Sequence, residues 1–275
     1  MTLRTALLLL IVGSGLASAS APQAPLPSDE ACRPLPPLLD LPPFPEGERL
    51  KFELDAMGAK AGQMTMQVLP LEDGLMPIRV EAEASTFLRS LRNVKGQATT
   101  WVDPRRLTPR RYAETSQDND VQRRYRVTFS KDAAAVGWSF NGRRGQSVLA
   151  LPKTTYDVAG ITYLARRLPL KEGQSLCLDL YGVRRIWRLW GTVTREEVNH
   201  PLGTFTAYRF SGEAARRDRP AVRREVHLWI SDDARRLPLA AVGTVNSAAM
   251  RATLVGYEGP GEKARRLDDP RSLKW

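Results

Sequence analysis

Apolar and polar residues alternate with a period of two over most of this chain, and no other feature constrains its fold as strongly. In the stretch 48–55, Leu50, Phe52 and Leu54 alternate with charged neighbours. Successive side chains of a strand point to opposite faces of a sheet, so this pattern predicts a strand with one buried and one solvated face. The alternation recurs in the stretches 63–68, 78–83, 121–129, 135–140, 176–181, 183–193, 205–212, 222–230, 238–246 and 251–257. One-sided alternation is typical of antiparallel sheets.

The stretch 155–167 departs from this period. Val158, Ile161 and Leu164 recur there at spacings of three and predict a helix, which Pro169 ends. The residue that caps its start is Thr154, Thr155 or Asp157. A long antiparallel sheet with one apolar face must curl, and we expect it to curl around this helix. The predicted fold class is therefore mainly β: a curved antiparallel sheet or open half-barrel wrapped around one main helix.

The first 19 residues read as a cleavable signal peptide. Arg4 precedes an apolar run over residues 6–12, and Ala17 and Ala19 form a small-x-small cleavage site. The run is shorter than the ~20 residues that span a bilayer, although a retained N-terminal anchor is the alternative. Cys32 lies too far along for lipidation, and no later segment is apolar enough to cross a membrane. We expect a released periplasmic protein, with an extracellular location left open.

The remaining sequence divides by composition into three parts. Residues 20–45 are rich in proline and predict an extended linker, more a spacer than a ligand for a partner. Residues 46–258 carry the alternating stretches and predict a single β-rich domain. Residues 259–275 form a C-terminal tail.

Basic residues are in excess, with 41 Lys and Arg against 30 Asp and Glu and a formal net charge of +11 at pH 7. The arginine pairs are spread along the chain, at Arg105-Arg106, Arg110-Arg111, Arg123-Arg124, Arg143-Arg144, Arg166-Arg167, Arg184-Arg185, Arg216-Arg217, Arg223-Arg224, Arg235-Arg236 and Arg265-Arg266. A nucleic-acid-binding protein concentrates such charge on one helix or arm, so nucleic acid is not the expected partner. Two interpretations stay open: arginines that bind anionic lipid, lipopolysaccharide or an acidic glycan, and arginines that only solvate strand faces.

Two cysteines remain after the signal peptide, Cys32 and Cys177. An even, small number in an oxidising compartment is compatible with one disulfide, which would tie the proline-rich segment to the β domain. The alternative is that Cys177 is a core residue of an alternating strand.

Side chains that carry catalysis are sparse. His200 and His227 are the two histidines, and no His, Cys and Asp cluster has metal-ligand spacing. There is no nucleophile elbow, phosphate-binding glycine loop or zincin helix. We therefore predict a non-enzymatic protein without a cofactor, and an enzyme with a site assembled from distant residues is the less favoured reading.

Tryptophans beside arginines predict a ligand rim. Its members are Arg184, Arg185, Trp187, Arg188, Trp190 and Trp229. Trp187 and Trp190 are three apart and must point to opposite faces of a strand. Arginine beside exposed tryptophan suits a lipid head group or a sugar ring, and the alternative is arginine stems that pack over tryptophans at the core edge.

Three segments in order resemble the family called domain of unknown function 3108. They are the opening 46–52 with 61–64, the helix and following turn 157–173, and the hairpin 228–239 with its Trp-x-Ser-x-Asp pattern. The resemblance covers residues 46–257. It implies an exported bacterial protein, typically periplasmic, with a curved sheet similar to the open half-barrels of lipoprotein carriers. It supplies no functional residues to transfer.

These observations favour a periplasmic envelope protein that binds a lipid-like or anionic envelope component. Acyl chains would occupy the concave side of the sheet, and arginines at its rim would hold anionic groups. The alternative is a structural or assembly factor that binds another envelope protein. Whether the space between sheet and helix is empty or packed decides between the two.

Overall fold

The computed structural model describes residues 25–86, 88, 93–152, 154–182, 184–245 and 248–259, and the predicted signal peptide and nearly all of the C-terminal tail lie outside them. Within the described residues the strands form one fifteen-stranded sheet. The strands are β1 (Arg49–Ala56), β2 (Ala59–Val68), β3 (Met76–Ala84), β4 (Val94–Val102), β5 (Pro109–Asp118), β6 (Val121–Phe129), β7 (Ala133–Phe140), β8 (Arg143–Ala150), β9 (Thr155–Asp157), β10 (Ser175–Gly182), β11 (Arg185–His200), β12 (Gly203–Arg216), β13 (Arg219–Ser231), β14 (Pro238–Val245) and β15 (Ala248–Glu258). The prediction of a mainly β chain is confirmed.

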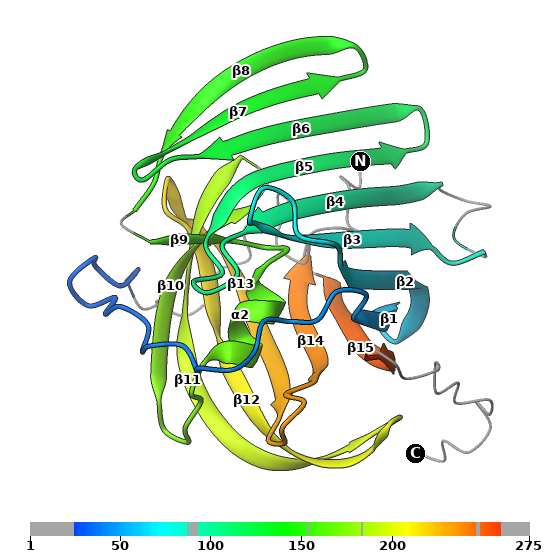
Figure 1. The fold of residues 1–275 in the computed structure, drawn as a ribbon. Coiled ribbons are helices and arrows are strands. Elements are labelled where there is room, and N and C mark those ends of the chain that lie inside the picture. Colours follow the sequence, from blue (N-terminus) through cyan, green and yellow to red (C-terminus); the bar gives the residue numbers. More distant parts are fainter. Residues whose placement is uncertain are drawn as a thin grey trace.

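The sheet is a single curled meander whose two ends do not join (Figure 1). Its order runs from β8 back to β1, then from β15 back to β9, so β1 and β15 are neighbours in the middle. Neighbouring strands are antiparallel as predicted, except that β9 pairs with β10 in parallel. The edges of the described sheet are therefore β8 and β9, and the half-barrel is open between them.

Glycine permits the closest approach of two long strands. Gly191 of β11 lies opposite Gly212 of β12. A Cβ atom on Gly212 would lie 2.0 Å from the carbonyl oxygen of Trp190, and one on Gly191 would lie 2.2 Å from that of Ser211. No other residue fits at either position without moving the backbone, so the pair fixes how tightly the sheet curls there.

The helix is shorter than the sequence predicts. Helix α2 spans Ile161–Arg167, seven residues, whereas residues 155–157 form β9 and pair with Asp179–Tyr181 of β10. The periodicity failed here because Asp157 is hydrogen-bonded into a turn before the helix, a choice that spacing does not reveal. The predicted stop before Pro169 is correct, since the helix ends at Arg167.

A sheet wrapped around one main helix is not confirmed, because α2 has seven residues and β11 has sixteen. The helix lies in the hollow of the sheet (Figure 1). Tyr163 and Leu164 are fully buried there, in one hydrophobic core with Leu50, Ile78 and Leu254 from the sheet. No helix among the described residues is both long enough and apolar enough to cross a membrane.

Candidate functional site

Helix α2 is attached to the sheet at its C-terminal end by a buried ion pair. The guanidinium of Arg166 donates to both carboxylate oxygens of Glu48, at 2.6 and 2.9 Å, and both side chains are almost completely buried. Arg236, in the turn after β13, donates to the carbonyl oxygens of Arg166 and Leu168. These bonds satisfy carbonyls that a helix end leaves without partners. The last turn of α2 is therefore held by the residue that precedes β1 and by the turn between β13 and β14.

A buried carboxylate fixes the other end of the helix. Asp157 Oδ1 accepts the backbone N–H groups of Ala159 and Gly160, and its Oδ2 accepts the hydroxyl of Thr100 on β4 at 2.9 Å. Burial raises the pKa of Asp157, and the three hydrogen bonds oppose this rise. The helix is thus held at both ends over the hollow of the sheet.

An apolar cavity of about 160 Å³ lies between α2 and the concave face of the sheet. From the helix side, Ile161, Thr162 and Ala165 line it. The sheet contributes mostly aliphatic and aromatic residues, among them Phe52, Met64, Met66, Val80, Leu176, Leu178, Leu180, Leu189, Phe210 and Leu228. Among the described residues that line it there is no Asp, Glu, Lys or Arg. The space between sheet and helix is therefore not fully packed by the chain's own side chains.

Residues 25–45, here called the strap, lie across β10, β11 and α2 (Figure 1). The disulfide between Cys32 and Cys177 attaches the strap to β10. Further along, the backbone N–H of Leu39 donates to the carbonyl oxygen of Arg167 at 2.8 Å, and Phe44 packs edge-on against Tyr163. The described part of the predicted linker is thus packed against the domain and is not a free spacer.

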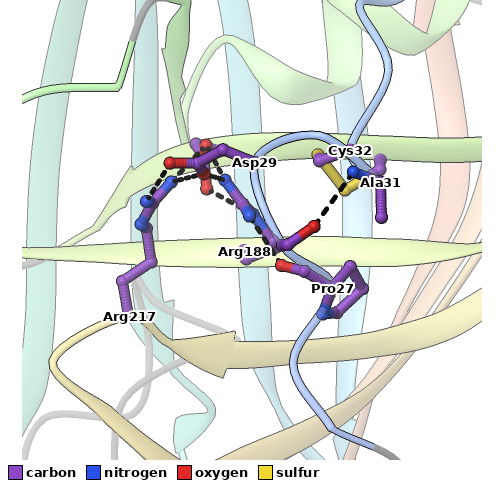
Figure 2. The surroundings of a disulfide bond; sticks show 9 residues. Pro27, Asp29, Ala31, Cys32, Arg188 and Arg217 are labelled. Carbon is purple, nitrogen blue, oxygen red and sulfur yellow. Dashed lines mark hydrogen bonds and ion pairs between the residues drawn. A yellow bond between two sulfur atoms is a disulfide. The ribbon is translucent and has the colours of Figure 1, made fainter.

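An acidic residue of the strap lies between two arginines (Figure 2). Asp29 accepts from Arg188 at 2.5 Å and from Arg217 at 2.9 Å. Both arginines also bind Asp179 on β10, at 2.8 and 3.0 Å. Hydrogen bonds from Arg217 and Arg188 lower the pKa of Asp29 to about 2, so the carboxylate is charged at neutral pH. The strap is therefore held by ion pairs as well as by the disulfide.

The six residues predicted as a ligand rim do not gather at one place. Trp187 is buried in the core, which agrees with its predicted place on the opposite face of the strand from Trp190. Arg188 is buried beneath the strap. Neither side chain is at a rim, because β11 is covered on both faces at this point, by the core and by the strap. Alternation revealed the two faces but not the strap.

The other four predicted rim residues contact the chain's own side chains. Trp190 lies under the guanidinium of Arg223 and Trp229 under that of Arg209. The indole N–H of Trp229 donates to Glu196 at 2.7 Å. Arg184 lies over the ring of Trp138, and Arg185 faces Asp218 at 3.6 Å. In three of these contacts a guanidinium group lies over a tryptophan ring, so these tryptophans are covered by arginines of the same chain.

The cavity residues of α2 were not singled out from the sequence. Ile161 was recognised as part of an apolar helix face, but Thr162 and Ala165 gave no signal of their own. A small residue at position 165, on the face that turns toward the sheet, is the one sequence feature that indicates space there. No group of three or more His, Cys, Asp or Glu side chains in the described ranges could hold a metal ion.

Comparison with solved structures shows the same fold in another protein. The β-barrel-like protein of domain of unknown function DUF1849 from Brucella abortus superposes with a TM-score of 0.53 at 12% identity, covering 80% of this chain and 100% of its own. A Bacteroides fragilis protein with a YmcC-like fold matches at a TM-score of 0.32 and 11% identity, over 78% of this chain and 97% of its own, which is too weak to support an argument. At such identities the first likeness shows the fold alone.

Comparison at the level of sequence assigns the chain to a family. A search of curated proteins finds no match. The family model described as "Protein of unknown function (DUF3108)" matches residues 51–254, which include every strand from β2 to β14 and the larger part of β1 and β15. Of the segments noted in the sequence, 157–173 and 228–239 lie wholly within this range, and the opening segment 46–52 lies partly within it. The chain therefore belongs to the DUF3108 family of proteins of unknown function.

Proposed function

We propose that this protein binds the apolar part of an amphiphile in the cavity between α2 and the sheet, without transforming it. The observation that carries the proposal is the cavity of about 160 Å³ with an uncharged, nearly all apolar lining. An apolar cavity of similar size, ~150 Å³, accepts a benzene-sized molecule, so this one takes the end of an acyl chain. Each buried methylene contributes about 0.8 kcal/mol to binding.

The lining supports binding rather than catalysis. Its side chains that can form hydrogen bonds are Tyr112, Thr162 and His227, and the hydroxyl of Tyr112 already donates to Glu114 at 2.7 Å. Such a set does not provide the acid, base and oxyanion donors that a reaction requires around one point. The setting we propose is the periplasm, on the strength of the N-terminal signal pattern.

A cavity-filling variant tests the proposal. Ala165→Leu adds carbon atoms to the helix side of the cavity, whereas Ala135→Leu makes the same change on an exposed face of β7. Calorimetric titration with dodecyl maltoside, below its critical micelle concentration, measures the affinity. If two methylenes of the ligand are displaced, Ala165→Leu weakens binding about tenfold, and Ala135→Leu leaves it unchanged.

Native mass spectrometry of the protein purified from the envelope of its host is the second test of the proposed function. A lipid that co-purifies with the wild-type protein and is lost in Ala165→Leu supports the proposal. A protein that carries no lipid and does not bind dodecyl maltoside contradicts it.

The open edge of the sheet favours a second candidate, an assembly factor that pairs with a strand of another envelope protein. Among the described strands β8 has one neighbour, β7, and Val148 on β8 is 71% exposed. An unpaired edge can accept a further strand. A photo-crosslinker at Val148 should then give one defined adduct in cells, and the same crosslinker at the exposed Met57 should not.

A further inference from the structure

A large cleft lies between the strap and the ends of the strands next to it. Its volume is about 1140 Å³. One wall is the strap, over residues 29–38. The opposite wall consists of the turn between β4 and β5, the turn between β6 and β7, and residues 151–156. One wall of the cleft is therefore formed by the strap, which the disulfide and the ion pairs of Asp29 hold in place.

Cationic side chains surround this cleft. They are Arg33 on the strap, Arg105, Arg106 and Arg110 near the first turn, and Lys131 on the second. In the part of the chain that the structure describes, none of the five has a carboxylate oxygen within 4.0 Å. Arg111, Arg195 and Arg216, by comparison, each have a carboxylate partner.

Acidic residues at the cleft do not cancel this charge. They are Asp29, Glu30 and Asp179. Asp29 and Asp179 are already paired with Arg188 and Arg217, so Glu30 is the remaining carboxylate among the acidic residues that line the cleft. Asp103, in the turn between β4 and β5, adds one further negative charge beside Arg105 and Arg106, and the five cations still outnumber the two. A cleft with low-dielectric walls and one sign of charge concentrates its field and attracts anions.

The turn between β4 and β5 presents its arginines from a fixed backbone. Asp103 Oδ1 accepts the backbone N–H groups of both Arg105 and Arg106 at 2.9 Å. Leu107 is buried in the core with a positive φ of 56°, and its N–H donates to the carbonyl oxygen of Asp103. Two guanidinium groups carried by one turn of fixed backbone suit the oxygens of a phosphate.

Apolar side chains line the cleft together with the cationic ones. Leu35, Leu38, Phe129, Leu151 and Tyr156 line it. Leu178 lines both the cleft and the cavity beside α2, so the two spaces are neighbours in the fold. This combination fits a ligand with an anionic group and an apolar body better than a free soluble anion.

We propose that the cleft binds the phosphate-type head group of an amphiphile, with Arg105, Arg106 and Lys131 as its main cationic contacts. The inference rests on the proposed function for the apolar part of the ligand, and on the cleft alone for the head group. It names the ligand class as a phosphate-bearing amphiphile.

The experiment compares three probes against matched charge variants of the whole disulfide-bonded protein. The probes are dodecyl phosphate, dodecyl maltoside with the same tail, and inorganic pyrophosphate without one. The cleft variant is Arg105→Gln/Arg106→Gln/Lys131→Gln, and the control is Arg124→Gln/Arg126→Gln/Arg144→Gln, which removes three exposed charges outside the cleft. Circular dichroism verifies that both variants fold.

The cleft variant should lose at least about tenfold in affinity for dodecyl phosphate, and under twofold for dodecyl maltoside. The control variant should keep both affinities, and 0.3 M salt should weaken dodecyl phosphate binding to the wild type. Equal losses for the two detergents, or equal losses in the two variants, overturn the inference. Pyrophosphate binding as tight as that of dodecyl phosphate, with the same dependence on the cleft, overturns the assignment to an amphiphile.

The two proposals fail in different ways. If dodecyl maltoside binds and Ala165→Leu weakens its binding, but the cleft variant loses the same affinity for both detergents, the head-group site is wrong and the proposed function stands. If neither detergent binds and pyrophosphate binds only when the cleft arginines are present, the amphiphile function is wrong and the cleft is an anion site for a soluble ligand.

Discussion

At the scale of single residues, the buried pair of Glu48 and Arg166 links the first strand to the helix. Its two short, parallel hydrogen bonds lie in the interior, where neither side chain has water as a substitute partner. Removing one member of such a pair leaves the other charge uncompensated. The pair is therefore a point where a small chemical change has a large effect.

We expect Glu48→Gln to lower the free energy of unfolding by about 3–5 kcal/mol, because Arg166 is left buried without its anion. Glu53→Gln removes the partner of Lys60 in an exposed pair and should cost no more than about 1 kcal/mol. Urea unfolding measures both. A cost for Glu48→Gln as small as that of Glu53→Gln would contradict the role given to the pair.

Asp157 gives the molecule a pH dependence of known sign. Burial raises its pKa in the folded protein above its unfolded value, so the group stabilises the fold in acid and loses this contribution as the pH rises through the folded-state pKa. Asp157→Asn keeps an acceptor for Ala159 and Gly160 but does not ionise. Wild type should therefore lose stability relative to Asp157→Asn as the pH rises from 4 to 8. A constant difference in urea unfolding over this range would refute the expectation.

The alternation of a strand predicted correctly which face a single residue lies on. It could not predict contacts between residues that are distant in sequence. The spacing of Trp187 and Trp190 gave their opposite faces, because a strand has a fixed period. Nothing in the spacing of Arg105, Arg106 and Lys131 places them across one cleft, because that depends on which turns meet. All three belong to an excess of basic residues, and the arginine pairs in it looked evenly spread along the chain.

At the scale of elements, the strap depends on its disulfide. The bond joins residues 145 apart, and the chain-entropy model assigns about 4–5 kcal/mol to a loop of this length. Reduction should lower the free energy of unfolding by up to this amount and make residues 25–45 susceptible to a protease. The Cys32→Ser/Cys177→Ser variant should behave like the reduced protein and ignore the reductant. An unchanged proteolysis pattern after reduction would show that ion pairs alone hold the strap.

The glycine pair between β11 and β12 provides a prediction of its own. Gly212→Ala places a methyl group 2.0 Å from the carbonyl oxygen of Trp190, so we expect a loss of about 1–3 kcal/mol in the free energy of unfolding. Gly137→Ala on β7 meets its nearest neighbour at 3.9 Å and should cost less than about 1 kcal/mol. Thermal and urea unfolding of both variants measure the difference, and equal costs would mean that the strands separate easily.

Elements were predictable where one local rule decided them. Alternation located the strands because each has one face in the core and one in solvent. It failed at residues 155–157, which pair with β10 although their spacing continues that of a helix. Alternation also could not predict that the proline-rich segment packs against the domain. An extended polyproline segment has no apolar period that indicates which surface it contacts.

At the scale of the whole molecule, the sheet has no natural point of division. β15 lies between β1 and β14, so the last strand of the described chain is a central strand. A protein truncated after residue 247 lacks β15 and should fail to give a cooperative unfolding transition, because both its neighbours lose their partner. A protein truncated after residue 259 retains every described strand and should unfold as the full chain does. Circular dichroism during thermal unfolding distinguishes them, and a folded 247-residue form would show that the two halves are independent.

The pairing of β1 with β15 also dictates an order of events in time. Within each half, neighbouring strands are neighbours in sequence and can form hairpins as soon as they are available. The pairing of Arg49 with Glu258 closes a loop of nearly the whole domain. It can form only after all the residues between the two strands are available to fold. In a chain that becomes available from its N-terminus, β1 therefore has an unpaired edge until β15 is present. The two halves join into one sheet in the final step of folding.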